Sequence, residues 1–380
     1  MLKKFELRNC RNFKDSIVMD LSKIGGYQYS TDCISDGFIS KALIYGRNAT
    51  GKTNLGECLM DITDMLSGRL NALDSIPFLN ADTSEDHADF IYTFLFDDTE
   101  IEYSYSKNAL RELVFEGLKI NGKNVFEINP SSIKVFSFNS NVIAAETLQP
   151  ERYVRALDEQ NAEEDHPTIS IPFLRWILAN AVLKLDSPLL KLSDFVEGMS
   201  ISAGNVSPRF FSRRFYKSLA QTGTLSSFER FLNEMGIECE LVLRELPEGD
   251  WQLYFKHKRL VPFGTNASSG TRMLMQIYRQ FIENGRPASF IYMDEFDAFY
   301  HYEMAEKVIR FFKEEFPRTQ IVLTTHNTNL MTNRLFRPDC LFILSRAGKL
   351  TALCDATLRE LREGHNLEKM YISGEFEKYE

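Results

Sequence analysis

The residues best suited to chemistry form a glycine-rich segment that ends in a lysine and a threonine. The segment reads Gly46-Arg47-Asn48-Ala49-Thr50-Gly51-Lys52-Thr53 and fits the pattern G-x-x-x-x-G-K-[ST] in full. In such a loop the backbone N–H groups face phosphate oxygens, and the lysine ammonium neutralises the charge of the β- and γ-phosphates. The threonine hydroxyl is a ligand for Mg²⁺. We therefore predict a nucleotide site at residues 46–53, which we call the phosphate loop.

The sequence on either side of the phosphate loop supports this prediction. A short apolar run at residues 42–45 has the pattern of a buried strand, and a helical pattern runs from about Lys52 to Leu66. The motif requires a strand that enters the loop and a helix that leaves it. The alternative is a glycine-containing turn that matches by chance, and it gives no reason for this order.

Two carboxylates, Asp294 and Glu295, directly follow a second apolar run, Phe290–Met293. Ligands of open α/β sheets bind at the carboxyl ends of the strands, and this places the pair beside the phosphates. We expect Asp294 to hold Mg²⁺ and Glu295 to polarise the attacking water. Taken alone, these residues also fit a strand that ends in an acidic turn, so their position relative to the other motifs decides between the two.

A histidine and a serine-glycine segment complete the set. His326 follows the apolar run Ile321–Thr324, so we expect it at the same sheet edge as Glu295. Small hydroxyl-bearing residues begin a helix near Thr271–Asn284 and leave backbone donors free for a phosphate. These residues are Ser268, Ser269, Gly270 and Thr271. Taken alone, a single histidine is more often structural, and Ser-Ser-Gly-Thr is also an ordinary helix cap.

The elements that must position these residues alternate between strand and helix. Strand-like runs occur at the start of the chain and over residues 90–140, and helix and strand alternate in the last third. Residues 145–238 instead show helical periodicity interrupted by prolines. We expect an α/β fold in which residues 1–144 and 239–380 form a discontinuous nucleotide-binding head. Residues 145–238 would be an inserted helical subdomain that serves as a lid or binds a partner.

Composition argues against several classes of protein. The chain has 380 residues with 44 Lys+Arg and 53 Asp+Glu, and its net charge of −9 is unlike that of a general nucleic-acid coat protein. Six scattered cysteines without a Cys-x-x-Cys pair argue against a disulfide framework or a zinc site. No apolar run is long enough for a bilayer, and no signal-peptide core opens the sequence. We therefore expect a cytoplasmic protein without a membrane partner.

Taken in order, these motifs resemble the ABC-type ATPases of the RecF, SMC and OLD (overcoming lysogenization defect) group. The resemblance implies an ABC-ATPase head, which is a P-loop NTPase fold with a mixed and parallel sheet and flanking helices. In it the phosphate loop is Walker A, Asp294 and Glu295 are Walker B, and residues 268–271 are the signature motif. Asp297 lies in the D-loop, and His326 is the switch histidine. The opening segment resembles the N-terminal strand of these heads, in which Arg11 would approach the nucleotide; it reads Leu7-Arg8-Asn9-Cys10-Arg11-Asn12-Phe13.

A closer resemblance is to the stand-alone AAA-fifteen family. Its members share the segment that reads here Asn366-Leu367-Glu368-Lys369-Met370-Tyr371-Ile372-Ser373-Gly374-Glu375-Phe376. The signature lacks the Leu-Ser-Gly-Gly-Gln form of transporters, no Q-loop glutamine is assigned, and no long heptad repeat predicts an SMC-like rod. Too few residues follow His326 for the nuclease domain of OLD proteins. We therefore expect any nuclease activity to come from a partner chain.

The resemblance implies a slow ATPase that converts ATP and water to ADP and phosphate, with Mg²⁺ as cofactor and Lys52, Glu295 and His326 as catalytic residues. Two heads would sandwich two nucleotides head to tail, as a homodimer or a higher homo-oligomer. Each site would join the Walker motifs of one chain to the signature of the other, with Asp297 at the interface. The family's settings are bacterial anti-phage and abortive-infection systems, in which the ATPase controls a separate effector, a nuclease or a toxin.

Three other functions stay open at this point. A RecF-like ATPase of DNA repair or chromosome maintenance would bind DNA directly, and the negative net charge weighs modestly against it. A scaffold that binds ATP without turnover conflicts with the intact Lys52, Glu295 and His326. The ATPase subunit of a transporter conflicts with the form of the signature and with the large insertion.

Two segments bear on nucleic acid as a partner. Pro208–Lys217 interleaves basic and aromatic residues, and Lys256–Arg259 is a basic run in an expected hairpin. The first segment also fits an amphipathic helix with its aromatic side chains buried, and the second also fits a solvated edge.

Overall fold

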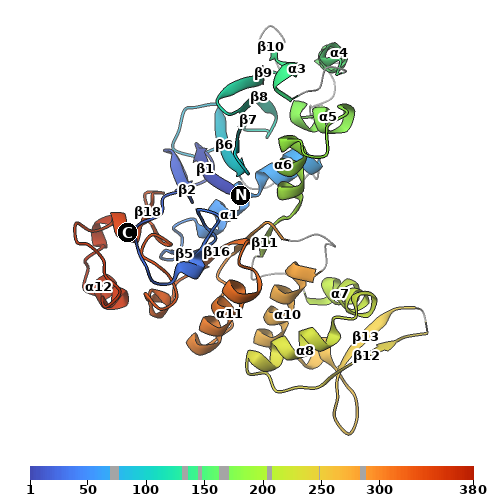
Figure 1. Ribbon diagram of the computed structural model, residues 1–380, viewed down its shortest axis with the longest axis vertical. Helices are drawn as coiled ribbons and strands as arrows, with labels where there is room; N and C mark the ends of the chain where they lie inside the picture. Colours follow the sequence, from blue (N-terminus) through green and yellow to red (C-terminus); the bar gives the residue numbers. More distant parts are fainter. Residues whose placement is uncertain are drawn as a thin grey trace.

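The computed structural model describes residues 1–68, 77–130, 136–143, 148–161, 171–202, 208–247, 249–282 and 288–380. In Figure 1 the described residues form a central sheet, a second sheet above it and a lobe of helices that extends below it. The fold class is the expected one: a mixed α/β fold with parallel and antiparallel sheets and flanking helices.

The central sheet contains the strands that end in the predicted motifs. Its first five strands are parallel, and the last pairs antiparallel with the strand before it. Because β15, β16 and β5 are neighbours, the two carboxylates, His326 and the phosphate loop all leave the sheet at one edge. Three of the strands are buried along their whole length, as expected for a sheet covered on both faces. The order is β11 (Met199–Ser202), β15 (Phe290–Met293), β16 (Gln320–Thr325), β5 (Lys41–Tyr45), β17 (Leu341–Leu344) and β18 (Leu350–Ala352).

The second sheet is antiparallel throughout its seven strands. Its long strands alternate between buried and partly exposed residues, which is typical of a sheet with one solvated face. Aromatic side chains such as Tyr92, Tyr103 and Tyr105 fill the buried face. The order is β10 (Phe136–Phe138), β9 (Lys123–Ile128), β8 (Leu113–Ile120), β7 (Thr99–Asn108), β6 (His87–Phe96), β1 (Leu2–Arg8) and β2 (Ile17–Asp20). The strand expected over residues 133–138 is described only from Phe136, because residues 131–135 lie outside the described part of the chain.

Helix α1 (Lys52–Leu59) lies between the two sheets. The hydroxyl of Tyr292, on β15, donates to the carbonyl of Lys52 at the start of the helix. The hydroxyl of Tyr92, on β6, reaches the carbonyl oxygens of Cys58 and Leu59 at its end. There the helix stops, and α2 (Asp61–Ser67) begins after Met60, so the single helix expected over residues 52–66 is divided.

Two helices that were expected in the insertion cover the antiparallel sheet. They are α5 (Phe173–Asn180) and α6 (Pro188–Glu197). Phe173 packs its ring against Phe126, Phe136 and Phe138 of the sheet, with ring centroids 4.9–5.6 Å apart. Glu116, fully buried on β8, accepts the backbone N–H groups of Phe173 and Leu174 at 2.6 and 3.0 Å, and this fixes the start of α5.

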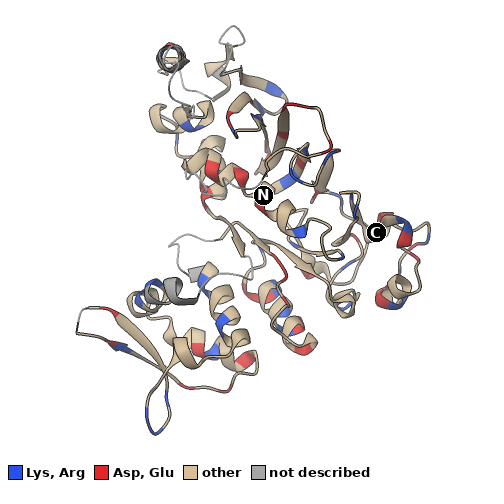
Figure 2. Ribbon diagram, turned by 180° about the vertical axis from the view of Figure 1, so that it is seen from behind, with Lys and Arg blue, Asp and Glu red and all other residues tan. Residues whose placement is uncertain are grey.

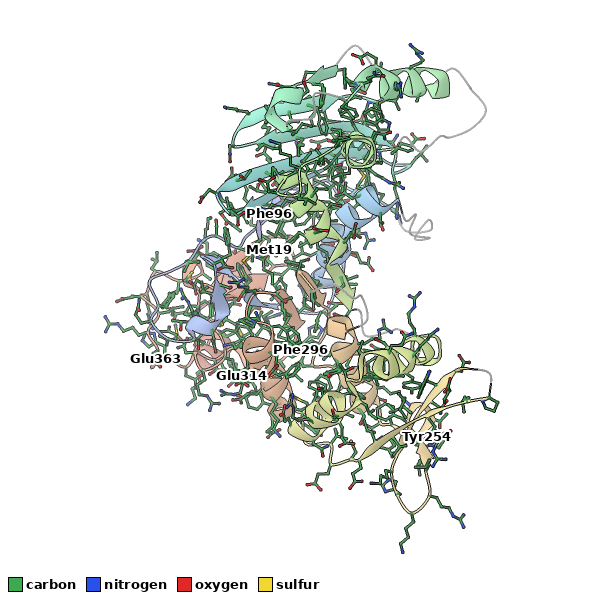
Figure 3. All side chains as sticks on the ribbon, turned by 45° about the vertical axis from the view of Figure 1, so that its right-hand side comes forward. Met19, Phe96, Tyr254, Phe296, Glu314 and Glu363 are labelled. Carbon is green, nitrogen blue, oxygen red and sulfur yellow. The ribbon has the colours of Figure 1, made fainter. Side chains whose placement is uncertain are left out.

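The helical lobe consists of residues 208–282, with a small three-stranded sheet at its far end, where Tyr254 lies in Figure 3. Its core centres on Phe228, which contacts the rings of Phe215, Phe263 and Tyr278. The lobe comprises α7 (Pro208–Thr222), α8 (Leu225–Glu234), β12 (Leu241–Glu245), β13 (Trp251–Phe255), β14 (Val261–Pro262), α9 (Phe263–Asn266) and α10 (Ser269–Ile282).

These packing arrangements correct the expected insertion over residues 145–238. Strand β11 lies within that range, yet it is an edge strand of the central sheet and pairs with β15 from Met199 to Ser202. Residues 171–197 cover the antiparallel sheet, whereas α7 and α8 pack with α10, far beyond residue 238. We therefore propose that the lobe of residues 208–282, rather than residues 145–238, is the unit set apart from the head.

The remaining elements lie outside the two large sheets and the lobe. They are β3 (Ile34–Ser35), β4 (Phe38–Ile39), α3 (Ser140–Ile143), α4 (Pro150–Asn161), α11 (Tyr302–Glu315) on the outer face of the central sheet, α12 (Leu367–Ile372), and 3₁₀ turns at Thr31–Cys33, Thr328–Leu330, Leu353–Asp355 and Glu377–Tyr379. Within the described ranges, no helix combines the length and the apolar character that crossing a membrane requires.

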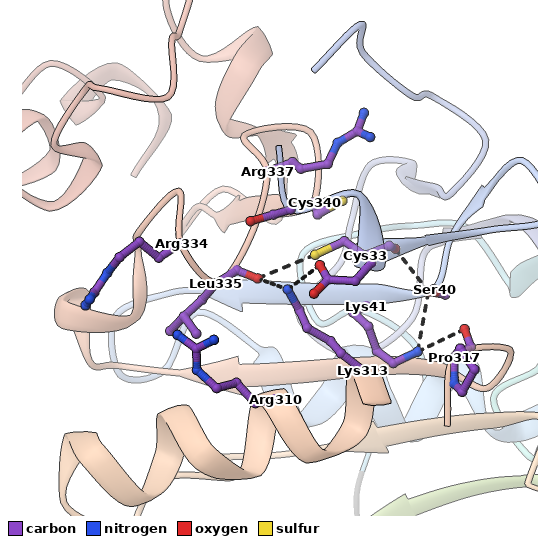
Figure 4. Close-up of polar contacts among 12 residues, drawn as sticks. Cys33, Ser40, Lys41, Arg310, Lys313, Pro317, Arg334, Leu335, Arg337 and Cys340 are labelled. Carbon is purple, nitrogen blue, oxygen red and sulfur yellow. Dashed lines mark hydrogen bonds and ion pairs between the residues drawn. The ribbon is translucent and has the colours of Figure 1, made fainter. Parts of the chain in front are cut away.

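Two buried lysines, Lys41 and Lys313, link the carboxyl end of α11 to neighbouring segments by hydrogen bonds and an ion pair (Figure 4). The ammonium of Lys41 donates to the carbonyl oxygens of Phe316 and Thr319, both at 2.9 Å, just beyond the end of α11. Lys313 pairs with Asp32 at 2.7 Å and donates to the carbonyl of Leu335. Cations at the carboxyl end of a helix satisfy its unpaired carbonyl groups. Burial nevertheless lowers the pKa of Lys41 to about 8.

Candidate nucleotide-binding site

The phosphate loop curls back on itself between β5 and α1. Gly51 has φ 99° and Ala49 has φ 64°, so the chain passes twice through the left-handed region. A Cβ on Gly46 would lie 2.6 Å from Oγ1 of Thr50, which leaves no room for a side chain there. Thr50 donates its hydroxyl to the carbonyl of Arg47 at 3.0 Å and so closes the turn. These constraints hold backbone N–H groups in a concave ring, the arrangement that binds phosphate.

Lys52 lies inside this ring. Its ammonium donates to the carbonyl of Gly46 at 2.8 Å and to that of Arg47 at 3.2 Å. Burial lowers the pKa of Lys52, and the nearby carboxylates of Glu295 and Asp294 partly offset this effect. An anion bound in the loop would favour the charged ammonium further, as the predicted role in phosphate binding requires.

Thr53 and Asp294 meet across the gap between α1 and β15. The hydroxyl of Thr53 donates to Oδ2 of Asp294 at 2.5 Å, and the hydroxyl of Thr324 donates to Oδ1 at 2.7 Å. Asp294 is 6% exposed, so both of its oxygens are held in place. Mg²⁺ prefers oxygen ligands, above all carboxylates, and an adjacent hydroxyl and carboxylate fit the ion.

Glu295 and His326 form a second polar contact at the same edge. Nε2 of His326 lies 2.8 Å from Oε1 of Glu295, as expected from their positions after neighbouring strands. Nδ1 of His326 lies 2.9 Å from the carbonyl of Gly46 and 3.2 Å from the ammonium of Lys52. A protonated Nδ1 donates to the carbonyl, whereas a deprotonated Nδ1 accepts from the lysine. The imidazole therefore bridges the carboxylate and the phosphate loop.

The backbone at Glu295 is strained. Its φ of 46° is in the left-handed region, where a non-glycine residue is uncommon. Its N–H donates to the hydroxyl of Thr324 at 2.8 Å, and this bond holds the turn after β15. The glutamate side chain remains about half exposed. Strain of this kind is often found where a catalytic side chain must leave the sheet in a fixed direction.

Asp297 lies in the turn that follows. Its Oδ2 accepts the hydroxyl of Thr325 at 2.8 Å. Burial raises the pKa of Asp297, and the hydrogen bond from Thr325 opposes that shift. Next to this turn, Phe299 is 45% exposed.

The signature segment lies away from the phosphate loop, at the start of α10 in the lobe (Figure 1). Ser268 caps the helix: its hydroxyl accepts the N–H of Thr271 at 3.1 Å. A Cβ on Gly270 would lie 3.1 Å from the carbonyl of Phe299, so the segment packs on the turn after Asp297. Within one chain these residues act as the ordinary helix cap that was the alternative interpretation. Ser268 and Ser269 are exposed.

Arg11 points at α1. Its guanidinium pairs with Glu57 and hydrogen-bonds Oδ1 of Asn54 at 3.1 Å. The role of Arg11 at the nucleotide therefore stays a proposal. No role was predicted for its neighbour Asn12, whose side-chain amide donates to the carbonyl of Thr50 at 3.2 Å and lies where a Cβ on Gly51 would be. The available signal was the place of Asn12 in the opening segment that resembles ABC-type heads, four residues after β1 ends at Arg8.

The end of the described chain also reaches the phosphate loop. Arg47, expected to bind nucleotide, pairs its guanidinium with Glu380. Tyr45, which leads into the loop, packs edge-on against Tyr371 of α12, with ring centroids 4.6 Å apart. Residues 366–376 had been noted only for a family resemblance, and nothing in the composition of the segment indicated this contact.

Of the two basic segments, the first is a helix. Phe215 and Tyr216 are buried on α7, whereas Arg214 and Lys217 are exposed, as an amphipathic helix predicts. The side chains of residues 209–213 lie outside the described part of the structure. Residues 256–259 are exposed in the loop between β13 and β14, where Lys256 pairs with Glu240 at 2.6 Å.

Comparison with solved structures finds heads of SMC proteins. An SMC head domain from Thermotoga maritima is 16% identical, with 90% of this chain and 94% of that chain covered and a TM-score of 0.43. The Smc head domain with an extended coiled coil bound to the C-terminal domain of ScpA, from Pyrococcus furiosus, is 15% identical, with 90% and 92% covered and a TM-score of 0.48. A Pyrococcus yayanosii Smc head is 13% identical, with 93% and 98% covered and the same TM-score.

Comparison with curated proteins finds no match. A protein-family model does match, over residues 41–332, and its range runs from β5 to the 3₁₀ turn after His326. This range includes the phosphate loop, both carboxylates and the histidine, and it covers well over half of the chain. The chain therefore belongs to the family described as "AAA domain, putative AbiEii toxin, Type IV TA system", and residues 41–332 contain an AAA-type ATPase domain.

Proposed function

We propose that this protein is an ATP-hydrolysing switch that dimerises head to tail around ATP and controls a separate effector protein. The observation that carries the proposal is the joint geometry at one sheet edge. Thr53 and Asp294 lie 2.5 Å apart, and His326 joins Glu295 to the carbonyl of Gly46. A phosphate-binding ring, a carboxylate free to accept a proton and a residue that orients that carboxylate are the parts that phosphoryl transfer to water needs.

The proposed reaction uses these residues in sequence. The N–H groups of the phosphate loop and the ammonium of Lys52 bind the β- and γ-phosphates. Glu295 accepts a proton from the water that attacks the γ-phosphorus, while the bond from that phosphorus to the oxygen of ADP breaks. His326 fixes the orientation of Glu295 through the 2.8 Å contact. Thr53 and Asp294 would hold Mg²⁺, which neutralises charge on the phosphate oxygens when bound.

The position of the signature segment supports a composite site. Ser268 and Ser269 are exposed at the start of α10, in the lobe, whereas their own chain's phosphate loop follows β5 at the edge of the central sheet. In the ABC-type ATPases that the sequence resembles, the signature of a second head completes each site. Asp297, in the turn against which Gly270 packs, would then lie at the dimer interface. Nucleotide would act as a ligand of the dimer and shift the population toward it.

The proposed setting is bacterial anti-phage defence or abortive infection, with a nuclease or a toxin as the effector. The family description names a putative toxin of a type IV toxin–antitoxin system, and this supports a role in growth control or defence. The resemblance to the stand-alone AAA-fifteen family points in the same direction. The residues named here would act in the cytoplasm as the ATPase component of such a system.

One observation favours a second candidate, a RecF-like ATPase that binds DNA. Lys258 and Arg259 extend into solvent in the loop between β13 and β14, and Figure 2 shows basic residues at its tip. Exposed basic groups on an extended loop are suited to phosphate contacts. DNA-stimulated ATP turnover that falls steeply with added salt would favour this candidate over the first.

The test of the first candidate measures mass and ATP turnover together. We expect slow turnover in the wild-type chain. Glu295→Gln should abolish turnover and should accumulate an ATP-dependent larger species, because the phosphates still bind when water is no longer activated. The matched control is Glu314→Gln, because Glu314 is an exposed glutamate at the end of α11 (Figure 3). This variant should match the wild-type chain in turnover and in mass. Normal turnover in Glu295→Gln, or a mass that ATP never changes, would contradict the proposal.

A further inference from the structure

A buried tyrosine of β15 contacts the first turn of helix α1. Tyr292 is fully buried, and its hydroxyl donates to the carbonyl of Lys52 at 2.6 Å. This carbonyl belongs to the residue that precedes Thr53. The strand is otherwise apolar, so the Tyr292 hydroxyl is a polar group in the core and requires a hydrogen-bond partner. The carbonyl of Lys52, at the start of α1, is that partner.

Gly56, one turn further along α1, leaves the space that the tyrosine ring occupies. A Cβ at this position would lie 2.4 Å from both Cδ1 and Cε1 of Tyr292, closer than carbon atoms can approach. Glycine in the interior of a helix is less favourable than alanine. Gly56 lies in the middle of α1, without a positive φ that would require glycine. The fit to Tyr292 is therefore the reason for glycine here.

The hydrogen bond between Tyr292 and Lys52 lies directly beside the hydrogen bond between Thr53 and Asp294. Tyr292 and Asp294 are two residues apart on β15 and its extension, so their side chains leave on the same side. Lys52 and Thr53 are consecutive. The bond from Tyr292 to the carbonyl of Lys52 and the bond from Thr53 to Asp294 are thus successive links between the same strand and the same helix start.

We propose that Tyr292 and Gly56 form a lock that sets the position of α1 against β15 and thereby keeps Thr53 next to Asp294, the two residues that would bind Mg²⁺. Tyr292 is a positioning residue, because it does not itself reach the nucleotide side of the helix. The inference rests on the proposed function, since it concerns how the ATPase site is aligned. The inference adds that the geometry of the site depends on the packing of the Tyr292 ring against Gly56.

A second buried tyrosine supplies the control. Tyr92 is fully buried on β6, and its hydroxyl bonds the carbonyl oxygens of Cys58 and Leu59 at 3.2 Å. It therefore contacts the same helix with the same chemistry, but at the end away from Thr53. Removing its hydroxyl should affect stability without changing how the two Mg²⁺ ligands meet.

The first experiment compares Tyr292→Phe with Tyr92→Phe. The Mg²⁺ concentration for half-maximal ATP turnover is measured, together with that for half-maximal binding of a fluorescent ATP analogue, which needs no turnover. Losing one buried hydrogen bond should raise both concentrations about three- to tenfold in Tyr292→Phe. Tyr92→Phe should leave both unchanged. An unchanged Mg²⁺ requirement in Tyr292→Phe, or an equal rise in Tyr92→Phe, would overturn the inference.

The second experiment is a double-mutant cycle on unfolding, and it does not depend on activity. Gly56→Ala should lower the unfolding midpoint strongly in the wild-type chain. Tyr292→Val removes Cδ1 and Cε1, so in that background Gly56→Ala should lower the unfolding midpoint much less. A smaller fall should remain, because Cδ1 of Ile201 lies 3.0 Å from the added Cβ. Strict additivity would show that the ring and the glycine do not form a lock. A wild-type chain that binds and hydrolyses no ATP refutes the proposed function instead, and the cycle still reports on the contact.

Discussion

At the scale of single residues, His326 connects the two halves of the site. Its imidazole contacts Glu295 on one side and the carbonyl of Gly46 on the other. A residue in this position can respond to a phosphate in the loop and change the orientation of the carboxylate. Its effect is therefore on the chemical step more than on binding.

We predict that His326→Ala lowers kcat by about 10²-fold, within the range for loss of a group that assists proton transfer, and changes the dissociation constant of ATP much less. The comparison of turnover with equilibrium ATP binding checks this. His365→Ala, which alters an exposed histidine of the segment before α12, is the control and should retain full turnover. A large loss of binding in His326→Ala would instead assign the histidine to nucleotide capture.

Glu116 carries a second prediction at this scale, on stability. Burial raises the pKa of Glu116 to about 7 from an ordinary value of 4.5, against the opposing hydrogen bonds from Leu174, Phe173 and Tyr103. The folded chain thus holds the proton more tightly than the unfolded chain does. The stability that this group contributes is fully present below pH 4.5 and is lost as the pH rises to about 7, by about 3 kcal/mol in total.

Denaturant unfolding at several pH values between 5 and 8 tests this sign. The free energy of unfolding of the wild-type chain minus that of Glu116→Gln should fall as the pH rises from 5 to 7, because this difference isolates Glu116 from the buried Met1 ammonium, whose lowered pKa of about 6 has the opposite effect on stability. The difference taken with Glu127→Gln, on the neighbouring strand β9, should stay constant over the same range. A constant difference for Glu116→Gln would contradict the prediction.

At the scale of elements, helix α12 touches two parts of the site. Tyr371 packs on Tyr45 at the entrance to the phosphate loop, and Glu368 accepts the hydroxyl of Thr328 at 3.3 Å, two residues after His326. Arg47 and Glu380 add an ion pair. An element in contact with both the phosphate loop and the segment after the histidine is well placed to respond to bound nucleotide.

We predict that Tyr371→Ala loosens residues 366–380, because it removes a ring that is only 8% exposed. Truncation of a buried aromatic side chain costs about 3–5 kcal/mol, and here the loss should be local. Hydrogen exchange of residues 366–380 should accelerate, while that of the antiparallel sheet stays slow. Ile372 lies on the same helix and is 68% exposed, so Ile372→Ala should leave hydrogen exchange unchanged in both regions. Equal exchange in Tyr371→Ala and wild type would mean that the segment is held by other contacts.

The elements also show what the sequence could predict and why. Strands β15 and β5 were found to within a residue, because each is a continuous apolar run between clear breaks. Strand β11 was missed because Met199-Ser200-Ile201-Ser202 is only four residues long, and only its pairing with β15 makes it a strand. The grouping of α7 and α8 with α10 was not predicted for the same reason: burial against a distant segment leaves no local pattern.

The site followed from the sequence to a similar extent. The phosphate loop, Asp294, Glu295 and His326 were placed together because parallel strands end at one edge of the sheet, and this is a rule of topology. Asn12, Tyr292 and Tyr371 were not found. Each contributes through a partner far away in the sequence, and an asparagine or a tyrosine alone carries no signal of which carbonyl or ring it will meet.

At the scale of the whole molecule, the central question is whether one chain can complete a site. The phosphate loop lies at the edge of the central sheet, after β5, and the signature segment lies in the lobe with Ser269 exposed. If sites are shared, each chain contributes its phosphate loop to one nucleotide and its signature to the other. A defect in either motif then has a different effect in a homodimer and in a mixed dimer.

We predict that two inactive variants restore turnover when mixed. Lys52→Ala cannot bind the phosphates, and Ser269→Arg blocks the exposed start of α10 without entering a buried position. A mixed dimer contains one site with an intact phosphate loop from the second variant and an intact signature from the first, so ATP turnover should reappear. Mixing Lys52→Ala with Glu295→Gln, whose defects fall in the same half of the site, should restore none. If the first mixture also stays inactive although both variants bind each other, then each chain works alone and the lobe serves another purpose.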